Sequence, residues 1–326
     1  MKETDIIKAI RTHLRNCPQQ RNGVFESDAE IVELGGQLLA FTTDDFSAED
    51  RMPAEDPQML GRNLAIATMS DLLAVGAAPE FMMQSLVVCP EMDREVIEGI
   101  SAGIQEALDE FGAFMLGGDV GLGAEWRYTG FAIGSFVKGA TPMSRKIPVN
   151  SGMIVATGGF GDANLSAVTS SSGLRFECRL DQARRIATGA AACIDTSDGL
   201  VRAIETIWEL NPKIRLVIDL DTIPYASGVN ELAASLSVRP EALLFGSAGE
   251  YELVAFVPEP HGRELLEGGG FTAIGAFLSD SPGGVYYRTA GADELIPHIA
   301  APDPRQMRDF EEYRDAIVAL THRLFG

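Results

Sequence analysis

The sequence predicts a two-domain α+β protein, and three observations support this fold class. At 326 residues the chain is longer than the roughly 100–200 residues of a typical domain. Predicted strands and helices alternate irregularly, which favours two α+β layers over one regular doubly wound sheet. A segment with two prolines and several polar residues, 139–152, separates two halves that each contain both element types. We therefore expect domains spanning residues 1–147 and 148–326.

The first half is predicted to contain three helices and five strands. Asp56 before Pro57 and Asp93 before an apolar stripe are typical helix N-caps, and Gly76 and Gly112 are typical helix ends. Two adjacent glycines between short apolar runs predict a hairpin. The expected helices cover 57–76 and 93–112, after an opening helix that stops near residue 17, and the expected strands cover 29–34, 37–43, 81–88, 113–116 and 128–138.

The second half is predicted to mix strands with helices in the same irregular way. Strands are expected at 153–157, 216–220, 251–257 and 271–277, and helices at 198–210 and 304–324. A glycine-rich turn, 158–161, follows the first of these strands and precedes a further helix. That turn fits both a phosphate cradle and a simple tight turn.

The charge balance disfavours two classes of partner. The chain has 26 Lys and Arg against 47 Asp and Glu, which gives a net charge of −21. Such an excess of negative charge repels nucleic acid and anionic membranes, so neither is expected as a partner. It suits a protein that concentrates divalent cations, although most acidic surfaces only improve solvation.

The sequence also predicts a soluble, cytoplasmic protein. Residues 1–16 are charged and amphipathic without an apolar signal core, and no stretch approaches the ~20 apolar residues of a membrane span. The four cysteines (Cys17, Cys89, Cys178 and Cys193) form no C-x-x-C pair. Neither a zinc site nor a disulfide framework is therefore expected.

Acidic motifs place carboxylates where a ligand could reach them. Asp44 stands at the expected end of one strand, and Asp119 follows two glycines at the expected end of another. The run Ile-Asp-Thr-Ser-Asp-Gly contains Asp195 and Asp198 and precedes an expected helix N-terminus, where free N–H groups favour anions. The first motif also fits a turn, and Asp198 or the preceding Ser197 also fits a helix N-cap.

Asp71 carries the strongest signal, because it lies inside an otherwise apolar helix. Burial of an ionised carboxylate is costly unless a cation or a hydrogen-bond donor compensates for it. Carboxylates gathered from strand ends make a hard-oxygen site of the kind that Mg²⁺ prefers together with water and substrate phosphates. Phosphoryl transfer depends mainly on positioning and charge neutralisation, which such a site supplies. The pattern therefore predicts an enzyme that binds ATP through Mg²⁺.

Other enzyme classes lack support in the sequence. The run Gly-Asp-Val-Gly-Leu-Gly at 118–123 does not lie between a strand and a helix as a dinucleotide fingerprint does, and no G-x-x-x-x-G-K-[ST] phosphate loop occurs. Neither G-x-S-x-G nor H-E-x-x-H occurs, which leaves the hydrolase and zinc-protease classes without a motif. No residue can be assigned as a general base.

In this order, the motifs resemble the superfamily of aminoimidazole ribonucleotide (AIR) synthetase and its ATP-dependent relatives, with the thiamine-monophosphate kinases as the nearest branch. The long helix motif (NLAIATMSDLLAVGAAP) and IDTSDGL are specific, and the other motifs support them. The matching stretches are 42–44, 63–79, 117–119, Arg145, 161–162, 194–200 and 249–253.

The resemblance implies two α+β domains, with N-terminal sheets that pair across a homodimer into a β-barrel, a C-terminal α/β sandwich, and ATP in the cleft between the domains. It implies a small-molecule phosphate acceptor as the other substrate. The implied metal ligands are Asp28, Thr43, Asp44, Asp71, Asp119, Asp195 and Asp198. The implied nucleotide contacts are Gly118, Arg145 and Ser197, and the implied substrate positions are Arg51 and Glu250.

This chain departs from the kinase pattern at three places. The early Gly-Asp-Asp reads Glu26-Ser27-Asp28, which removes one carboxylate. Arg51 stands where the kinases carry a substrate-contacting histidine, and Gly249 stands where they carry an acidic residue. The ATP-site pattern is therefore retained better than the substrate pattern, and the acceptor stays open.

The alternatives to a kinase are another enzyme of the same superfamily and a non-catalytic paralogue. A synthetase of the AIR type would activate an amide or formyl oxygen by phosphorylation. The hydrogenase-maturation branch is disfavoured because it ends in a cysteine and this chain ends in Gly326, and the selenophosphate branch has weak support in Cys17 near Gly23. A non-catalytic paralogue would bind nucleotide without turnover.

Overall fold

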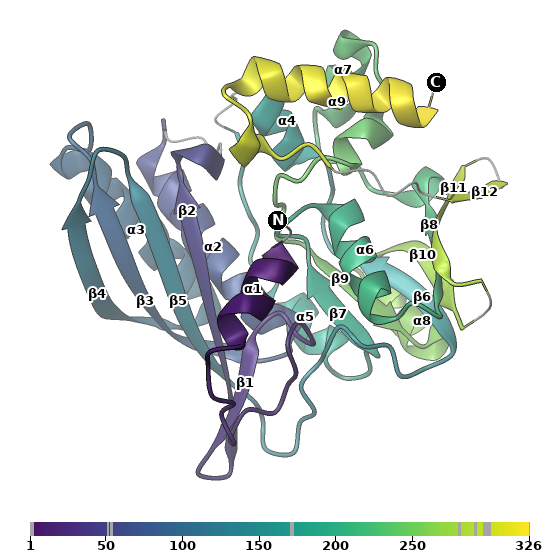
Figure 1. Ribbon diagram of the computed structural model, residues 1–326, viewed down its shortest axis with the longest axis horizontal. Coiled ribbons are helices and arrows are strands. Elements are labelled where there is room, and N and C mark those ends of the chain that lie inside the picture. Colours follow the sequence, from purple (N-terminus) through teal and green to yellow (C-terminus); the bar gives the residue numbers. More distant parts are fainter. Residues whose placement is uncertain are drawn as a thin grey trace.

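The computed structural model describes residues 3–50, 52, 55–169, 173–279, 282–289, 292–295 and 301–325. Within these residues the chain forms a mixed α+β fold with two separate β-sheets, as Figure 1 shows. One sheet has the strand order β1-β2-β5-β3-β4, and the other has the order β12-β11-β8-β10-β6-β9-β7. The predicted α+β class is confirmed.

The first sheet is antiparallel except for the parallel pair β3 and β4. Gly35 and Gly36 connect β1 to β2 with φ values of 60° and 82°, which explains why glycine occupies both positions of this tight hairpin. The strands are β1 (Glu30–Leu34), β2 (Gln37–Ser47), β3 (Ala78–Val88), β4 (Phe114–Leu122) and β5 (Arg127–Ser135).

Two helices, α2 (Pro57–Ala74) and α3 (Arg94–Phe111), pack on one face of this sheet. The predicted caps are confirmed: Asp56 accepts hydrogen bonds from the first turn of α2, and Asp93 accepts one from the first turn of α3. Gly112 ends α3 in the left-handed conformation that favours glycine.

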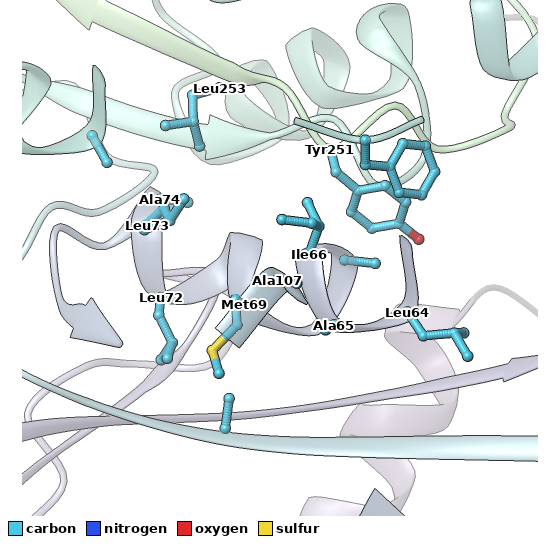
Figure 2. Close-up of a cluster of buried hydrophobic side chains, with 14 of the residues drawn as sticks. Leu64, Ala65, Ile66, Met69, Leu72, Leu73, Ala74, Ala107, Tyr251 and Leu253 are labelled. Atoms are coloured by element: carbon cyan, nitrogen blue, oxygen red, sulfur yellow. The ribbon is translucent and has the colours of Figure 1, made fainter. Parts of the chain in front are cut away.

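Helix α2 is buried along almost its whole length because it lies between the two sheets. It contacts β2 and β5 of the first sheet and β7 and β9 of the second. In Figure 2, Ile66 faces Tyr251 while Met69 and Leu72 point to the opposite side of the helix. Because α2 is buried on all sides, each polar residue on it needs a hydrogen-bond partner or a ligand.

The second sheet is surrounded by the remaining longer helices (Figure 1). Its strands are β6 (Ser151–Ala156), β7 (Ala192–Asp195), β8 (Arg215–Asp219), β9 (Leu253–Val257), β10 (Thr272–Leu278), β11 (Gly284–Thr289) and β12 (Ala292–Leu295). The helices are α4 (Asp162–Thr169), α5 (Leu180–Ile186), α6 (Leu200–Leu210), α7 (Val229–Leu236), α8 (Glu259–Glu267) and α9 (Phe310–Phe325). Helix α1 (Glu3–Arg11) precedes the first sheet, and the short 3-10 turns are η1 (Ala48–Asp50), η2 (Leu220–Thr222), η3 (Pro240–Leu244) and η4 (Pro304–Gln306).

Several predicted boundaries are wrong. Asp44 and Asp119 do not end their strands: β2 continues to Ser47, and β4 continues to Leu122. The glycines before Asp119 do not stop β4, because β4 stays paired with β3 across a shift in register there. Helix α6 begins after Asp198, and its N-cap is a glycine, so neither Ser197 nor Asp198 serves as an N-cap.

Two further observations concern the chain as a whole. Among the described residues, no helix has the length and apolar character needed to cross a bilayer. The four cysteines are free thiols, and two of them, Cys89 and Cys193, are buried. The expected cytoplasmic location stays a prediction.

The contact between α2 and α3 depends on glycines and gives a stability prediction. A Cβ at Gly103 would lie 1.8 Å from the backbone oxygen of Gln58, so the two helix backbones meet directly. We expect Gly103→Ala to lower the free energy of unfolding by about 2 kcal/mol or more, although alanine is by itself the better helix former. Chemical denaturation measures this, with Ser101→Ala on the exposed face of α3 as the control. A Gly103→Ala variant as stable as the wild type would contradict the close packing.

Candidate functional site

A cavity of about 910 Å³ lies where the two sheets approach each other. Aspartates from both halves of the chain line it, together with residues of α1 and α6. Figure 1 shows α1 beside β2 and α6. The acidic residues in the wall are Asp28, Asp44, Asp71, Asp195 and Asp198.

Each of these aspartates is placed by a different part of the fold. Asp28 lies in the loop before β1, Asp44 lies on β2, and Asp71 lies on α2. Asp195 is the last residue of β7, and Asp198 lies in the turn that leads into α6. The site therefore exists only when the first sheet, α2 and the second sheet are packed together.

The tightest group contains Asp28, Asp71 and Asp195. One carboxylate oxygen from each lies within 4.8 Å of the other two, which makes the group a candidate metal site. The Asp28 carboxylate accepts a hydrogen bond from Arg145 Nη2 at 2.6 Å, and its other oxygen is buried without a partner among the described residues. An unpartnered buried carboxylate oxygen that faces two other carboxylates fits a cation ligand.

Hydroxyl groups hold the other two carboxylates in place. Thr42 donates a hydrogen bond to Asp71, and Ser70, the neighbour of Asp71 on α2, donates one to Asp195. Ser197 Oγ donates to the other oxygen of Asp195 at 2.9 Å. These donors fix the carboxylate orientations without neutralising their charge.

Burial and mutual repulsion favour the protonated form of the cluster. Burial, and next the Asp195 carboxylate, raise the pKa of Asp44 to about 7. Burial, and next the Asp28 carboxylate, raise the pKa of Asp195 to about 6. Burial also raises the pKa of Asp71 well above its usual range, and neighbouring carboxylates add to the rise. A divalent cation would relieve both causes, because it replaces lost hydration and attracts every carboxylate.

Arg145 is the cation that the described structure places in contact with this group. Burial raises the pKa of Asp28 even though the Arg145 guanidinium opposes that rise. Arg145 and Ser197 both line the cavity, so the structure brings these two predicted residues beside the aspartates. The roles predicted for them in nucleotide and metal binding stay predictions.

Other predicted residues lie away from this group. The side chain of Thr43 is exposed and donates to the backbone oxygen of Gly130 at 2.9 Å, on β5. Gly118 and Asp119 lie on β4, and β5 and β3 separate them from β2. Since neighbouring strands are about 4.8 Å apart, this places Asp119 roughly 14 Å from Asp44 along the sheet. Arg51 lies outside the described residues.

Glu250 lies in a separate buried position. Its carboxylate accepts a hydrogen bond from the backbone N–H of Gly161, in the glycine-rich turn after β6. That N–H is therefore already occupied, which favours a tight turn over a phosphate cradle. Gly118 likewise has a packing reason, because a Cβ there would lie 1.8 Å from the backbone oxygen of Gln84.

Sequence reasoning missed a second pocket and the arginine beside it. A pocket of about 50 Å³ adjoins the cavity and shares Ser197 and Asp198 with it. Arg305, from η4, lines this pocket and pairs with Asp50 on η1. No local pattern marks Arg305, since the sequence around it predicts only the start of a helix.

The raised pKa values predict a pH-dependent effect of Mg²⁺ on stability. An unfolded aspartate has a pKa of about 3.9, so between roughly pH 4 and pH 7 the folded metal-free protein holds more protons than the unfolded chain. Its stability contribution from Asp44 and Asp195 therefore falls as the pH rises through this window, and Mg²⁺ should offset that fall. We expect the Mg²⁺-induced gain in unfolding free energy to be about 1–2 kcal/mol larger at pH 8 than at pH 5.

Denaturant unfolding with and without Mg²⁺ at the two pH values measures this difference. Asp71→Asn should shrink it, because the variant removes one carboxylate and keeps the shape. Asp45→Asn is the control, because Asp45 is exposed and pairs with Arg127 and Thr129. An equal Mg²⁺ effect at both pH values would argue against a carboxylate site for the ion.

Comparisons with known proteins found one matching family and several relatives. The family described as "AIR synthase related protein, N-terminal domain" matches residues 26–136. The thiamine-monophosphate kinase of Pyrococcus horikoshii is 26% identical over 273 residues, which cover 79% of this chain and 83% of the relative. That of Methanopyrus kandleri is 28% identical over 291 residues, which cover 84% of this chain and 89% of the relative.

Solved structures share the fold. AaThiL complexed with AMPPCP and TMP superposes with a TM-score of 0.74 at 19% identity, and the match covers 91% of this chain and 97% of that one. At this identity the likeness concerns the fold alone. The chain is therefore similar to the AIR synthase-related proteins over residues 26–136 and to the thiamine-monophosphate kinases over most of its length.

Proposed function

We propose that this chain is an ATP- and Mg²⁺-dependent phosphotransferase of the thiamine-monophosphate kinase type, acting on a small-molecule phosphate acceptor. The observation that carries this proposal is the convergence of Asp28, Asp71 and Asp195 within 4.8 Å of one another. They line a cavity of about 910 Å³, which is within the size range of small-molecule sites. The similarity to kinases that act on thiamine monophosphate supports the same chemistry here.

In this proposal the aspartate cluster holds Mg²⁺, with Asp44 and Asp198 at its edge. When bound, Mg²⁺ supplies the positive charge that neutralises the phosphate oxygens of ATP. Arg145 lies within hydrogen-bond distance of Asp28, so the phosphates would meet a guanidinium beside the metal ligands. Ser197 keeps Asp195 oriented and lines the same cavity.

The acceptor is the finer part of the proposal. Relatives are named for thiamine monophosphate, which makes this compound the first acceptor to test. Gly249 and Arg51 replace residues expected to contact that substrate. The second candidate is therefore an acceptor that carries the same phosphate group on a different organic part. Residues 1–147 would form the domain that holds most of the metal ligands, and residues 148–326 would complete the cleft.

The proposal includes a homodimer with paired N-terminal sheets. The face of the first sheet opposite α2 and α3 carries exposed apolar side chains at its β4 edge, including Phe114, Leu116 and Val120. A second copy that covers this face would bury them and could close the two open sheets into a barrel. Within one chain, the strand spacing places Asp119 about 14 Å from Asp44. In the dimer, Asp119 would approach the aspartate site of the partner.

Calorimetric titration of ATP with and without Mg²⁺ tests the nucleotide site. We expect wild-type protein to bind ATP far more tightly with Mg²⁺, and Asp71→Asn to weaken that binding about 100-fold, because the metal loses a ligand inside a buried cluster. Asp45→Asn should bind as the wild type does, since its exposed side chain pairs with Arg127 on the other side of β2. Wild-type protein that binds no Mg·ATP would overturn the proposed function.

Complementation tests the role of Asp119 in a dimer. If Asp119 serves the partner's site, mixing an inactive Asp119→Asn chain with an inactive Asp71→Asn chain gives hybrid dimers with one intact site each. Random exchange should then restore roughly a quarter of the wild-type rate of ADP release. No recovery after verified subunit exchange would mean that Asp119 does not act across the interface, and a monomer in light scattering would contradict the dimer.

A further inference from the structure

The second pocket borders the aspartate cavity. Ser197 and Asp198 line both spaces, so the two are connected through the turn before α6. The walls of the second pocket include the aromatic side chains of Phe176 and Tyr251 and the guanidinium of Arg305. A group that crosses from the cavity to this pocket therefore passes beside Asp198 and Arg305.

Arg305 is held by a contact between the two halves of the chain. Its Nε donates to Asp50 Oδ1 at 2.5 Å, and the other oxygen of Asp50 accepts from the backbone N–H of Ser47 at 2.6 Å. The Asp50 side chain is only 8% exposed, so this carboxylate is fixed on both oxygens. The backbone N–H of Arg305 donates to Asp303, which caps η4.

This arrangement leaves the outer part of the guanidinium available. The Asp50 contact uses Nε, and within the described part of the chain the two Nη groups have no hydrogen-bond partner. The side chain is 49% exposed and lines the pocket. Two parallel N–H donors of a guanidinium match a phosphoryl group, whose oxygens accept them in pairs.

Arg305 lies on the side of the aspartate group that Arg145 does not contact. Arg305 and Asp198 both line the second pocket, so the guanidinium lies on the Asp198 side of the group. Arg145, by contrast, makes its hydrogen bond to Asp28. The two arginines therefore act on different sides of the same carboxylate group.

We propose that Arg305 is a catalytic residue that contacts the phosphoryl group during its transfer, and that Asp50 is its positioning residue. This inference rests on the proposed function. In the step concerned, an acceptor oxygen forms a bond to the γ-phosphorus while the bond from that phosphorus to the β,γ-bridging oxygen breaks, and ADP leaves with the electron pair. A phosphate acceptor attacks as an anion, and water as acceptor releases its proton to solvent.

The chemistry explains why a second cation is needed at this place. Negative charge spreads over the three outer oxygens of the moving group, and an arginine directed at them is worth about 10³–10⁵ in rate where such residues have been measured. The aspartates cannot supply this contact because they repel the same oxygens. In the alternative interpretation, the role of the Asp50–Arg305 ion pair is purely structural, and it only holds η4 against η1.

Steady-state release of ADP separates the two interpretations. The substrates are Mg·ATP with thiamine monophosphate, or with water alone, as acceptor. We expect Arg305→Ala to lower kcat about 100–1000-fold while KM for ATP changes less than about threefold. Arg308→Ala is the matched control, because Arg308 lies three residues further along, is 84% exposed and pairs with Glu312. It should leave both constants unchanged.

Chemical rescue gives a result that a purely structural role of Arg305 would not produce. Millimolar ethylguanidinium should raise the rate of Arg305→Ala at least about tenfold by occupying the vacated space, and should not affect Arg308→Ala. If Arg305→Ala does not fold, Arg305→Lys tests the same point: it keeps the charge, loses the paired donors and should lower kcat about tenfold or more. Asp50→Asn should lower kcat less than Arg305→Ala does.

The outcomes distinguish this inference from the function on which it rests. Wild-type protein that binds no Mg·ATP and releases no ADP overturns the proposed function and the inference with it. An active wild type, together with a folded Arg305→Ala or Arg305→Lys variant of unchanged kcat, overturns the inference alone. So does a loss of rate in Arg305→Ala that follows a loss of thermal stability and is not rescued by ethylguanidinium.

Discussion

Repulsion among three buried carboxylates is the constraint on which this structure depends. Asp28, Asp71 and Asp195 come from a loop, a helix and a strand, yet their oxygens lie within 4.8 Å of one another. At an effective dielectric constant of about 20, two full charges at that distance repel by roughly 3–4 kcal/mol. Packing holds the three side chains together against this repulsion. Without a cation, protons lower it, as the raised pKa values of Asp71 and Asp195 indicate, and a bound cation would replace these protons. A site of this kind therefore favours the state with a bound cation over the empty state.

Helix α2 supplies much of that packing, because it is the element that both sheets share. Its apolar side chains face the first sheet on one side and Tyr251 and Leu253 on the other, so it cannot move toward either without opening the other contact (Figure 2). Asp71 is thereby fixed on a helix that is buried on all sides. The hydrogen bond from Ser70 to Asp195 then links this helix directly to the end of β7. The packing of α2 in the hydrophobic core therefore determines where the site lies.

Local signals in the sequence predicted the elements whose stability is itself local. The caps at Asp56 and Asp93 and the glycine hairpin follow from backbone chemistry within a few residues. Asp71 was predictable because its apolar neighbours make a charge there costly. Strand β7 was not, since four buried residues carry no periodicity. Arg305 was not either, because its partner Asp50 lies 255 residues away and nothing local marks the pair.

The departure from the kinase pattern at Glu26-Ser27-Asp28 changes the charge of the aspartate cluster. Glu26 does not replace the missing carboxylate, because it pairs with Lys146 at 2.8 Å and accepts a hydrogen bond from the backbone N–H of Gly23. Ser27 is buried and uncharged, so the cluster carries one negative charge fewer than the full motif would give it. The Arg145 contact offsets part of the charge on Asp28. In the proposed function, this smaller negative charge would balance less cationic charge than the complete motif would.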